Sequence, residues 1–436
     1  MNWGAELSYI YNGGRVSTNS TRDGEKILYM GNEAERLKEI IRLDTELADV
    51  QDVDLLLERI LTEARKITSA DAGTIYIKHG EDLVFSYAQN ATLQKELPPG
   101  QKLIYTSFRV KINTKTIAGY VAATGEILNI PDVYRIPKKS PFSFDSSFDE
   151  RSNYTTTSVL AVPLKSNTII GVLQIINKTG DGGRVVPFDP EDDVLCRHFA
   201  STASLALQRA QLTRALLLRM IAMAELRDPK ETGPHVNRVA SYATEIYETW
   251  ARKRDVPKSE VNKNRDVLRM AAMLHDVGKV AITDMILKKP GPLTKKEREI
   301  MQGHTYLGAR LFIDKQSAFD EIASQAALRH HENWDGTGYP GHVDVRTGKP
   351  SRTDETGGAA SLKGDEIPLF GRVVAVADVF DALHSKRTYK EAWSEKDVLA
   401  EIRNLSGKKF DPDIVEAFFE CIDVIRSIAK RYPDTD

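Results

Sequence analysis

The stretch LRHHENWDGTGYPG, residues 328–341, places two adjacent histidines before a run of turn-forming residues. His330 and His331 supply neighbouring imidazoles. Asp335-Gly336 and Gly338-Tyr339-Pro340 then predict a tight loop, because glycine permits backbone shapes that other residues resist. From residue 225 onward, the surrounding sequence is mostly helical in its pattern. The stretch therefore indicates a helical domain with chemistry gathered around a loop.

Further potential metal ligands lie on both sides of this stretch: Glu231, His235, His275, Asp276, His304 and Asp378. Seven of the nine histidines follow residue 230. One histidine on a helix is more often a packed or surface group than a ligand, and one carboxylate is more often a cap or an ion pair. The combination reverses these odds. Imidazole and carboxylate ligands suit iron, manganese or zinc, and phosphate chemistry commonly uses two or more such ions.

Local context supports three of these ligands. His275 and Asp276 follow the mostly apolar stretch 268–274, so both side chains can emerge from the end of one buried helix. Asp378 lies among small and apolar residues, where an unpaired carboxylate would be costly and metal ligation would remove that cost. Glu231 is separated from His235 by Gly233 and Pro234, so we expect it to precede the first helical turn.

The pattern HD…HHExxDGxGYP, from about residue 215 to 432, resembles the HD-GYP branch of the HD-domain phosphohydrolases. The resemblance implies an all-α HD-superfamily domain with two or three divalent metal ions, iron or manganese foremost. It implies hydrolysis of cyclic di-GMP to pGpG, with GMP as a further product that a third metal would favour. Metal ligation would fall on Glu231, His235, His275, Asp276, His304, His330, His331 and Asp378.

In this assignment, six of the ligands form a two-metal centre that Asp276 bridges, and Glu231 with His235 adds a third site. The catalytic residues would be His275, Asp276 and Lys279. The family's phosphate-contacting positions fall on Lys279, Arg387 and Lys390, which outside this motif would be only solvated charges. Substrate fit and partner contacts are expected from Asp335, Gly338, Tyr339 and Pro340. No residue is assigned as general acid.

Two other functional classes are compatible with such a domain: a silent receptor that only binds the nucleotide, and a phosphohydrolase for another substrate. The complete ligand set argues against the receptor. The loop, together with Arg387 and Lys390, argues against an unrelated substrate but leaves other cyclic dinucleotides open. One departure from the family is the stretch 343–361, which typical members lack. It is expected to be either a disordered surface insertion or a lid.

The N-terminal half has a different pattern. Apolar residues at helical spacing from residue 33 to 67 predict two amphipathic helices with a break near 50–54. Residues 73–90 and 158–178 predict β-hairpins that turn at 79–82 and 166–167, and residues 118–133 between them predict a short helix and a strand. This order predicts an α+β sandwich with an antiparallel sheet.

Residues 50–207 resemble a GAF domain, on this order of elements and on pieces such as Gly119-Tyr120-Val121 and Asn129-Ile130-Pro131. The resemblance implies a small-molecule ligand, such as a cyclic nucleotide, with a signature that falls on Asn177, Lys178, Phe188 and Asp192. Asp193 stands where that signature has Glu. Alternatively, Asn177 and Lys178 simply end a strand, and the two aspartates begin a helix whose dipole favours carboxylates.

Residues 192–227 predict one long helix with Leu195, Phe199, Leu205, Leu212, Leu216, Met220 and Met223 near a single stripe. The expected partner of this stripe is the same helix of a second subunit in a parallel homodimer. The predicted organisation is a flexible tail (1–32), a GAF-like sensory domain (33–207), a linker helix (208–227) and an HD-GYP catalytic domain (228–436).

Gross composition agrees with a cytoplasmic signalling enzyme. A length of 436 residues suggests two to three domains. The net charge of −2 argues against a nucleic-acid polymer as partner. Cys196 and Cys421 are isolated in apolar helical patterns, which fits a reducing compartment. The start has no secretory pattern, and no stretch predicts a membrane span.

Overall fold

The computed structural model describes residues 42, 45–48, 50–98, 103, 108–225, 233–385 and 393–433. The described residues from 47 onward belong to one unit, which is described below. None of the described helices is long and apolar enough to cross a membrane. The predicted boundaries of the tail, the sensory domain, the linker and the catalytic domain remain predictions.

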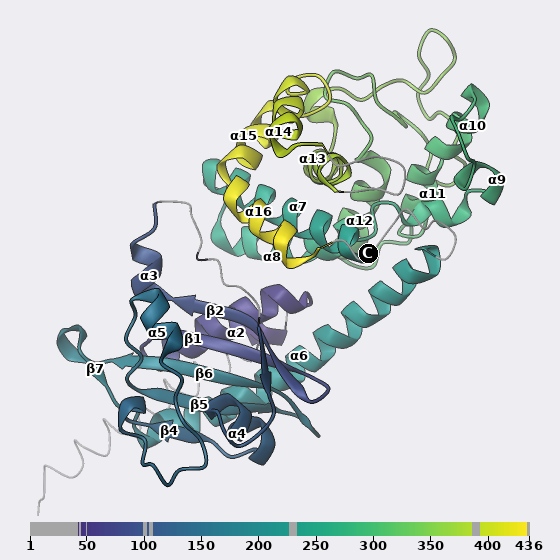
Figure 1. Ribbon diagram of the computed structural model, residues 1–436. Helices are drawn as coiled ribbons and strands as arrows, with labels where there is room; N and C mark the ends of the chain where they lie inside the picture. The colour runs from purple at the N-terminus through teal and green to yellow at the C-terminus, as the bar shows by residue number, and fades with distance from the viewer. Residues whose placement is uncertain are drawn as a thin grey trace, which may run out of the picture. The chain divides into compact units, whose positions relative to one another are not determined.

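An antiparallel sheet forms the N-terminal domain (Figure 1). Its strands run in the order β3-β2-β1-β6-β5-β4, and β7 pairs with β6. The strands are β1 (Ala70–His79), β2 (Asp82–Asn90), β3 (Arg109–Lys111), β4 (Leu128–Ile130), β5 (Val159–Lys165), β6 (Ile169–Thr179) and β7 (Val185–Val186). Both predicted hairpins are confirmed: β1 pairs with β2 around Gly80-Glu81, and β5 pairs with β6 around residues 166–168.

Helices cover this sheet. They are α2 (Val53–Ile67), α3 (Ala91–Lys95), α4 (Ile117–Thr124), η1 (Val133–Arg135), α5 (Ser147–Ser152), η2 (Asp181–Gly183) and α6 (Pro190–Glu225). The predicted break before α2 is confirmed, because Asp52 is in an extended conformation and its carboxylate caps the helix by accepting from the Asp54 and Leu55 N–H groups. The short helix and strand predicted for 118–133 are confirmed as α4 and β4.

The long helix α6 is confirmed, but its predicted single apolar stripe is wrong. Phe199 is buried, because the first half of α6 packs against α2 and β5. Leu205, Leu212, Leu216, Met220 and Met223 are exposed on another face. Helical periodicity identifies which positions are apolar. It does not distinguish an apolar face that packs inside the domain from a neighbouring apolar face that stays exposed.

Only helices form the C-terminal domain in its described residues (Figure 1). They are α7 (Gly233–Lys253), α8 (Lys258–Ala272), η3 (Val277–Ala281), α9 (Asp284–Leu287), α10 (Lys295–Gln302), α11 (His304–Arg310), α12 (Ala318–Arg329), η4 (Gly364–Glu366), α13 (Leu369–His384), α14 (Glu395–Asn404), α15 (Pro412–Glu420) and α16 (Ile422–Arg431).

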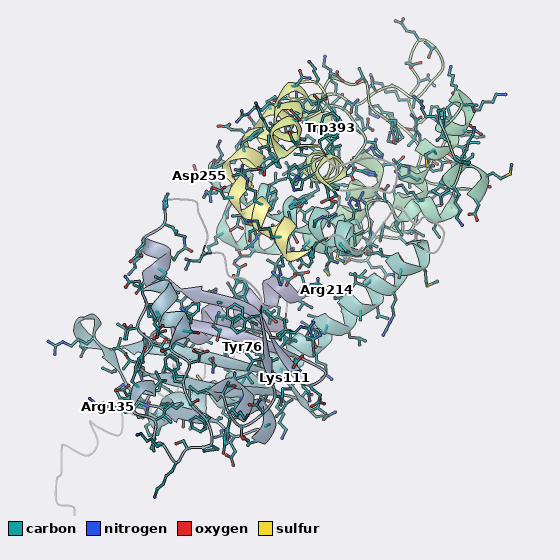
Figure 2. The ribbon with its side chains drawn as sticks, in the orientation of Figure 1. Tyr76, Lys111, Arg135, Arg214, Asp255 and Trp393 are labelled. Carbon is teal, nitrogen blue, oxygen red and sulfur yellow. The ribbon has the colours of Figure 1, made fainter. Side chains whose placement is uncertain are left out.

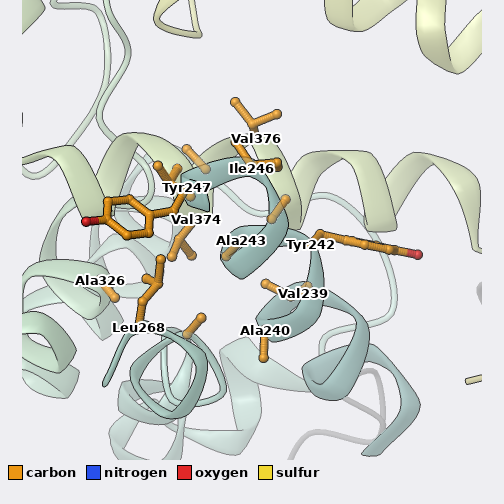
Figure 3. Packing of buried hydrophobic residues seen from close by; sticks show 14 of the residues in the cluster. Val239, Ala240, Tyr242, Ala243, Ile246, Tyr247, Leu268, Ala326, Val374 and Val376 are labelled. Atoms are coloured by element: carbon orange, nitrogen blue, oxygen red, sulfur yellow. The ribbon is translucent and has the colours of Figure 1, made fainter. Parts of the chain in front are cut away.

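The central helix α7 carries the core of this domain. Val239, Ala243 and Ile246 recur at spacings of three and four residues, so they share one face of the helix. That face packs against Leu268 of α8 and Val374 of α13 (Figure 3). Because α7, α8, α12 and α13 share this core, their ends are held in fixed positions, and most of the candidate ligands lie at those ends.

The stretch 343–361 is ordered, so the interpretation of a disordered insertion is wrong. It folds into two small turns with isolated bridges, Val343 to Pro350 and Thr353 to Ala359. Asp344 and Asp354 each accept backbone and hydroxyl hydrogen bonds from a following threonine. Local carboxylate-to-backbone bonds thus order a stretch whose composition suggested disorder.

Candidate metal centre

The candidate ligands come from the ends of helices and from the interior of α13. His235 lies in the first turn of α7, and His275 and Asp276 follow the last turn of α8. His304 begins α11, while His330 caps the C-terminus of α12 and His331 follows it. Asp378 lies within α13. Helix ends project side chains past the packed core, so ligands that are distant in sequence meet in one place.

One ligand group contains Asp276, His304, His330 and His331, whose ligand atoms all lie within 4.8 Å of one another. Nε2 of His304 is 3.1 Å from Oδ1 of Asp276, and Nε2 of His330 is 3.5 Å from the same oxygen. The Nε2 atoms of His304 and His330 are 3.4 Å apart. This donor set, three imidazoles and a carboxylate, suits iron, manganese or zinc.

A second group contains His235, His275 and Asp378. Nε2 of His235 and Nε2 of His275 are each 3.8 Å from Oδ1 of Asp378. Nε2 of His275 is also 3.4 Å from Oδ2 of Asp276, the oxygen that the first group does not use. Asp276 therefore offers one oxygen toward each group, as a carboxylate that bridges two ions would.

The seven predicted ligands within the described residues lie in these two groups, and one of them is grouped differently from the prediction. His235 was assigned with Glu231 to a third site, but it lies with His275 and Asp378. Glu231 is outside the described residues, so the third site stays a prediction. Arg387 and Lys390 are also outside the described residues.

Hydrogen bonds from Nδ1 fix the ring orientation of three ligand histidines, His275, His304 and His330. Nδ1 of His275 is 2.8 Å from the Ala272 carbonyl, Nδ1 of His304 is 2.8 Å from the Met301 carbonyl, and Nδ1 of His330 is 2.9 Å from the Ala326 carbonyl. A carbonyl oxygen only accepts, so Nδ1 donates in each case. In the neutral ring, Nε2 then carries the lone pair that a metal requires.

Sequence reasoning missed the residue that fixes His235. Nδ1 of His235 is 2.8 Å from Oδ2 of Asp381, and Arg238 donates to both oxygens of Asp381 at 2.6 and 2.9 Å. All three side chains are buried. The available signal was the spacing of Asp378 and Asp381, which places both carboxylates on one side of a helix.

Burial and charge set the protonation of this centre. Burial by itself would raise the pKa of Asp276, but Lys279 and His275 outweigh it and hold the pKa well below its usual range. Burial lowers the pKa of His330, and it holds the pKa of His331 well below its ordinary value. Asp276 is therefore ionised, and both imidazoles are neutral near pH 7, which is the state that binds metal.

The loop of residues 333–341, called the signature loop below, lines this centre. The ring of Tyr339 lies 4.8 Å from the ring of His331 and 6.5 Å from that of His304, measured between centroids. A Cβ at Gly338 would meet the Asn333 nitrogen at 2.2 Å, so only glycine fits there. The carboxylate of Asp335 accepts from the Thr337 backbone and hydroxyl, which holds the loop itself. Roles in substrate fit stay predictions.

Lys279 lies at the centre but contacts a predicted ligand. Its Nζ donates to Oδ2 of Asp276 at 2.7 Å. This contact contributes to the low pKa of Asp276. The predicted contact of Lys279 with substrate phosphate stays a prediction.

The four candidate residues for the GAF ligand contact protein groups. The Asn177 side chain accepts from the Thr157 N–H and donates to Tyr154 and to the Thr155 carbonyl. Lys178 forms ion pairs with Asp189 and Asp192, and Phe188 is buried. The Lys178 ion pairs join β6 to the start of α6, and the Asn177 contacts join β6 to the segment before β5. The expected contact with a small molecule stays a prediction.

Comparisons with known proteins agree with both domains. Residues 52–207 match the model of the GAF domain, and residues 232–383 match the model of the HD domain. A protein of Vibrio cholerae named 3'3'-cGAMP-specific phosphodiesterase 2 is 36% identical over 53% of this chain and 39% of its own length.

Two further relatives carry the name cyclic di-GMP phosphodiesterase. That of Vibrio cholerae is 39% identical over 50% of this chain and 41% of its own length. That of Thermotoga maritima is 38% identical over 49% of this chain and 50% of its own length. The chain thus spans half or less of the length of these relatives. The chain therefore contains a GAF domain at residues 52–207, followed by an HD domain at residues 232–383.

Proposed function

We propose that this chain is a metal-dependent phosphodiesterase that hydrolyses a cyclic dinucleotide, with cyclic di-GMP as substrate and pGpG as product. The observation that carries the proposal is the presence of two ligand groups that share Asp276. One oxygen of this carboxylate faces the first group, and the other oxygen faces the second group. The names of the relatives support the substrate class. Two or three divalent ions, iron or manganese, complete the site.

These residues would hold divalent ions, which would supply Lewis acidity and activate a water for attack on phosphorus. The chain's own residues have separate tasks. Asp276 and Asp378 bring the negative charge that holds the cations, and the backbone carbonyls orient the imidazoles. Lys279, Arg387 and Lys390 are proposed to neutralise the phosphodiester, and Tyr339 forms one wall of the site.

The test is metal analysis of protein purified without oxygen, followed by chromatography of the products from a panel of cyclic dinucleotides. We expect cyclic di-GMP to give pGpG, and prolonged incubation shows whether GMP follows. The panel includes 3'3'-cGAMP, because one relative carries that name. Metal-loaded protein that leaves the whole panel intact contradicts the proposal.

The matched variants are Asp276→Ala and Asp284→Ala. Asp276→Ala removes the shared carboxylate, so we expect turnover to be abolished and metal content to fall. Asp284 is an exposed carboxylate on α9 that pairs with Lys288, and its loss should leave both unchanged. Full turnover by Asp276→Ala would remove the proposed centre.

Regulation by the GAF domain is a further part of the proposal. Its support is Asp54, in the first turn of α2, whose carboxylate contacts Arg214 of α6, Arg269 of α8 and Arg431 of α16 (Figure 2 labels Arg214). Helix α8 leads directly to His275. A ligand that shifts α2 would thus act on the helix that precedes the metal centre. Asp54→Asn should change turnover at constant metal content, and identical turnover removes this support.

A parallel homodimer through α6 completes the proposal. Val194, Leu205, Leu212, Leu216 and Met223 are all at least half exposed. At 100° per residue they fall within an arc of about 40°, which makes a narrow apolar stripe along the helix. Such a stripe is the pattern by which two identical helices pack together, so a second copy of this chain is the proposed partner.

A further inference from the structure

Lys409 is a cation beside the signature loop, and the sequence motifs did not single it out. It lies in the turn between α14 and α15, which runs beside the signature loop. The Trp334 N–H donates to the Lys409 carbonyl at 3.1 Å, and the Asp335 N–H donates to the Lys408 carbonyl at 2.8 Å. These backbone bonds fix the turn against the loop that follows His330 and His331.

Adjacent lysines in this turn have different surroundings. The Lys409 side chain is partly buried, and its Nζ is 3.4 Å from Oδ1 of Asn333 in the signature loop. The Lys408 side chain is exposed, and its Nζ is 3.4 Å from Oδ1 of Asn404 in α14. The turn therefore directs one ammonium toward the signature loop and the other toward the exposed surface of α14.

The charge of Lys409 acts on the metal ligands. Burial lowers the pKa of Lys409, and the carboxylate of Asp378 opposes that shift. In turn, the positive charge of Lys409 makes a smaller contribution to the lowered pKa of His331, after burial, His330 and His304. Asp378 and His331 belong to different ligand groups, so the charge of Lys409 is felt by a member of each group.

Within the described part of the chain, no carboxylate forms an ion pair with Lys409. Its hydrogen-bond acceptor is the neutral amide of Asn333. A desolvated ammonium without an anionic partner is unfavourable. By contrast, Lys279 already donates to a carboxylate, that of Asp276. Lys409 thus keeps its charge available for an anion that enters the site.

We propose that Lys409 binds a phosphate oxygen of the cyclic dinucleotide and holds the substrate against the metal centre. This inference rests on the proposed function, because it assigns a contact to that substrate. The contact forms when substrate binds and persists during reaction, so its loss should raise KM more than it lowers kcat. Lysine suits this task as a compact point charge on a flexible stem.

The experiment compares Lys409→Gln with Lys408→Gln in metal-loaded, full-length protein. Loss of a hydrogen bond to a charged group should raise KM for cyclic di-GMP about tenfold or more. We expect kcat to change by less than about threefold. Lys408→Gln should match the wild-type protein, and Lys409→Arg should recover most of the lost affinity. KM for Lys409→Gln should also become less sensitive to salt, because one charge contact is gone.

Metal content and thermal unfolding of each variant separate a substrate contact from a structural role. Wild-type KM for Lys409→Gln, or a rise in KM that Lys408→Gln reproduces, overturns the inference. A loss of metal or of folded protein that Lys409→Arg does not repair also overturns it. Failure of the wild-type protein to hydrolyse any cyclic dinucleotide is a separate result, because it rejects the proposed function before the variants are compared.

Discussion

At the scale of single residues, Asp381 links the metal centre to the core. Its carboxylate fixes the ring of His235 and accepts two hydrogen bonds from Arg238. Asp381→Ala should weaken metal binding about 10–100-fold, the usual cost of losing such an outer partner. It should also lower the melting temperature, because the buried guanidinium of Arg238 loses its anion.

Metal competition with a chelator and thermal unfolding measure these two effects of Asp381→Ala. Asp381→Asn keeps an oxygen that can accept from Nδ1, so it should retain more metal than the alanine variant. Asp397→Ala, on the exposed start of α14, serves as control. Wild-type metal affinity in Asp381→Ala would show that His235 is held by other contacts.

Asp266 gives the protein a predictable pH dependence. Burial raises its pKa to about 6, although its carboxylate accepts from the Gln51 and Asp52 N–H groups. The pKa of Asp266 is higher in the folded state than in the unfolded state. Its contribution to the free energy of unfolding is therefore fully present below about pH 4 and is lost as the pH rises through about 6. Asp266→Asn removes the titration. The variant should match the wild type at pH 4 and exceed it at pH 8 by up to about 3 kcal/mol.

Chemical unfolding of wild type and Asp266→Asn between pH 4 and 8 measures this difference in the free energy of unfolding. The amide oxygen of asparagine can still accept both backbone hydrogen bonds, so the comparison isolates the charge. A constant difference across this range would show that Asp266 does not titrate there.

At the scale of elements, the metal centre depends on the close approach of η3 and α11. A Cβ built at Gly278 would lie 1.9 Å from the His304 carbonyl and 2.4 Å from the Gly308 nitrogen. Gly278→Ala must therefore push α11 away and displace His304 from Asp276. We expect a loss of stability of about 1–3 kcal/mol, as for other overpacked sites, and reduced metal content.

Thermal unfolding and metal analysis of Gly278→Ala test this approach of the two elements. Gly358→Ala is the control, because a Cβ there meets only side-chain atoms of Asp354 and Thr356, at 3.3 Å or more. If Gly278→Ala retains full metal content, then His304 does not depend on the packing of α11.

Sequence reasoning predicted elements whose signals are local. Both hairpins follow from apolar alternation on each side of a turn, and the break before α2 follows from the interrupted helical spacing of apolar residues near 50–54. The prediction of disorder for residues 343–361 failed. The order of this stretch comes from carboxylate hydrogen bonds within two turns and from the packing of Val343 and Val345 against the buried cluster that contains Leu328. Composition shows that the stretch is polar, but it does not show which hydrogen bonds its side chains form.

In the candidate site, too, the residues with local sequence signals were predicted and those that depend on long-range contacts were not. Its ligands were predictable, because motif spacing places imidazoles and carboxylates at recognisable positions. Asp381 and Lys409 were not predicted, because their roles depend on neighbours that are 146 and 76 residues away in the chain, His235 and Asn333. Such contacts exist only after the helices have packed.

At the scale of the whole molecule, the exposed stripe of α6 leads to a prediction about assembly. Leu212→Glu combined with Leu216→Glu places two charges on this stripe, so we expect the dimer to become a monomer. Light scattering measures the mass of each variant. Met285→Glu removes another exposed apolar side chain, on α9, and should remain dimeric. A double variant of unchanged mass, or a monomeric wild type, contradicts the proposed interface.

The hydrogen bonds behind the ligand rings also bear on how such a centre can change during evolution. His275, His304 and His330 take their orientation from backbone carbonyls, which every amino acid provides. Other residues can therefore replace Ala272, Met301 and Ala326 during evolution, because the backbone carbonyl that accepts the hydrogen bond is kept. His235 depends instead on a side chain, Asp381, that one codon change can remove. Among homologous chains, the group containing His235 should therefore be lost first, leaving descendants with the Asp276 group alone.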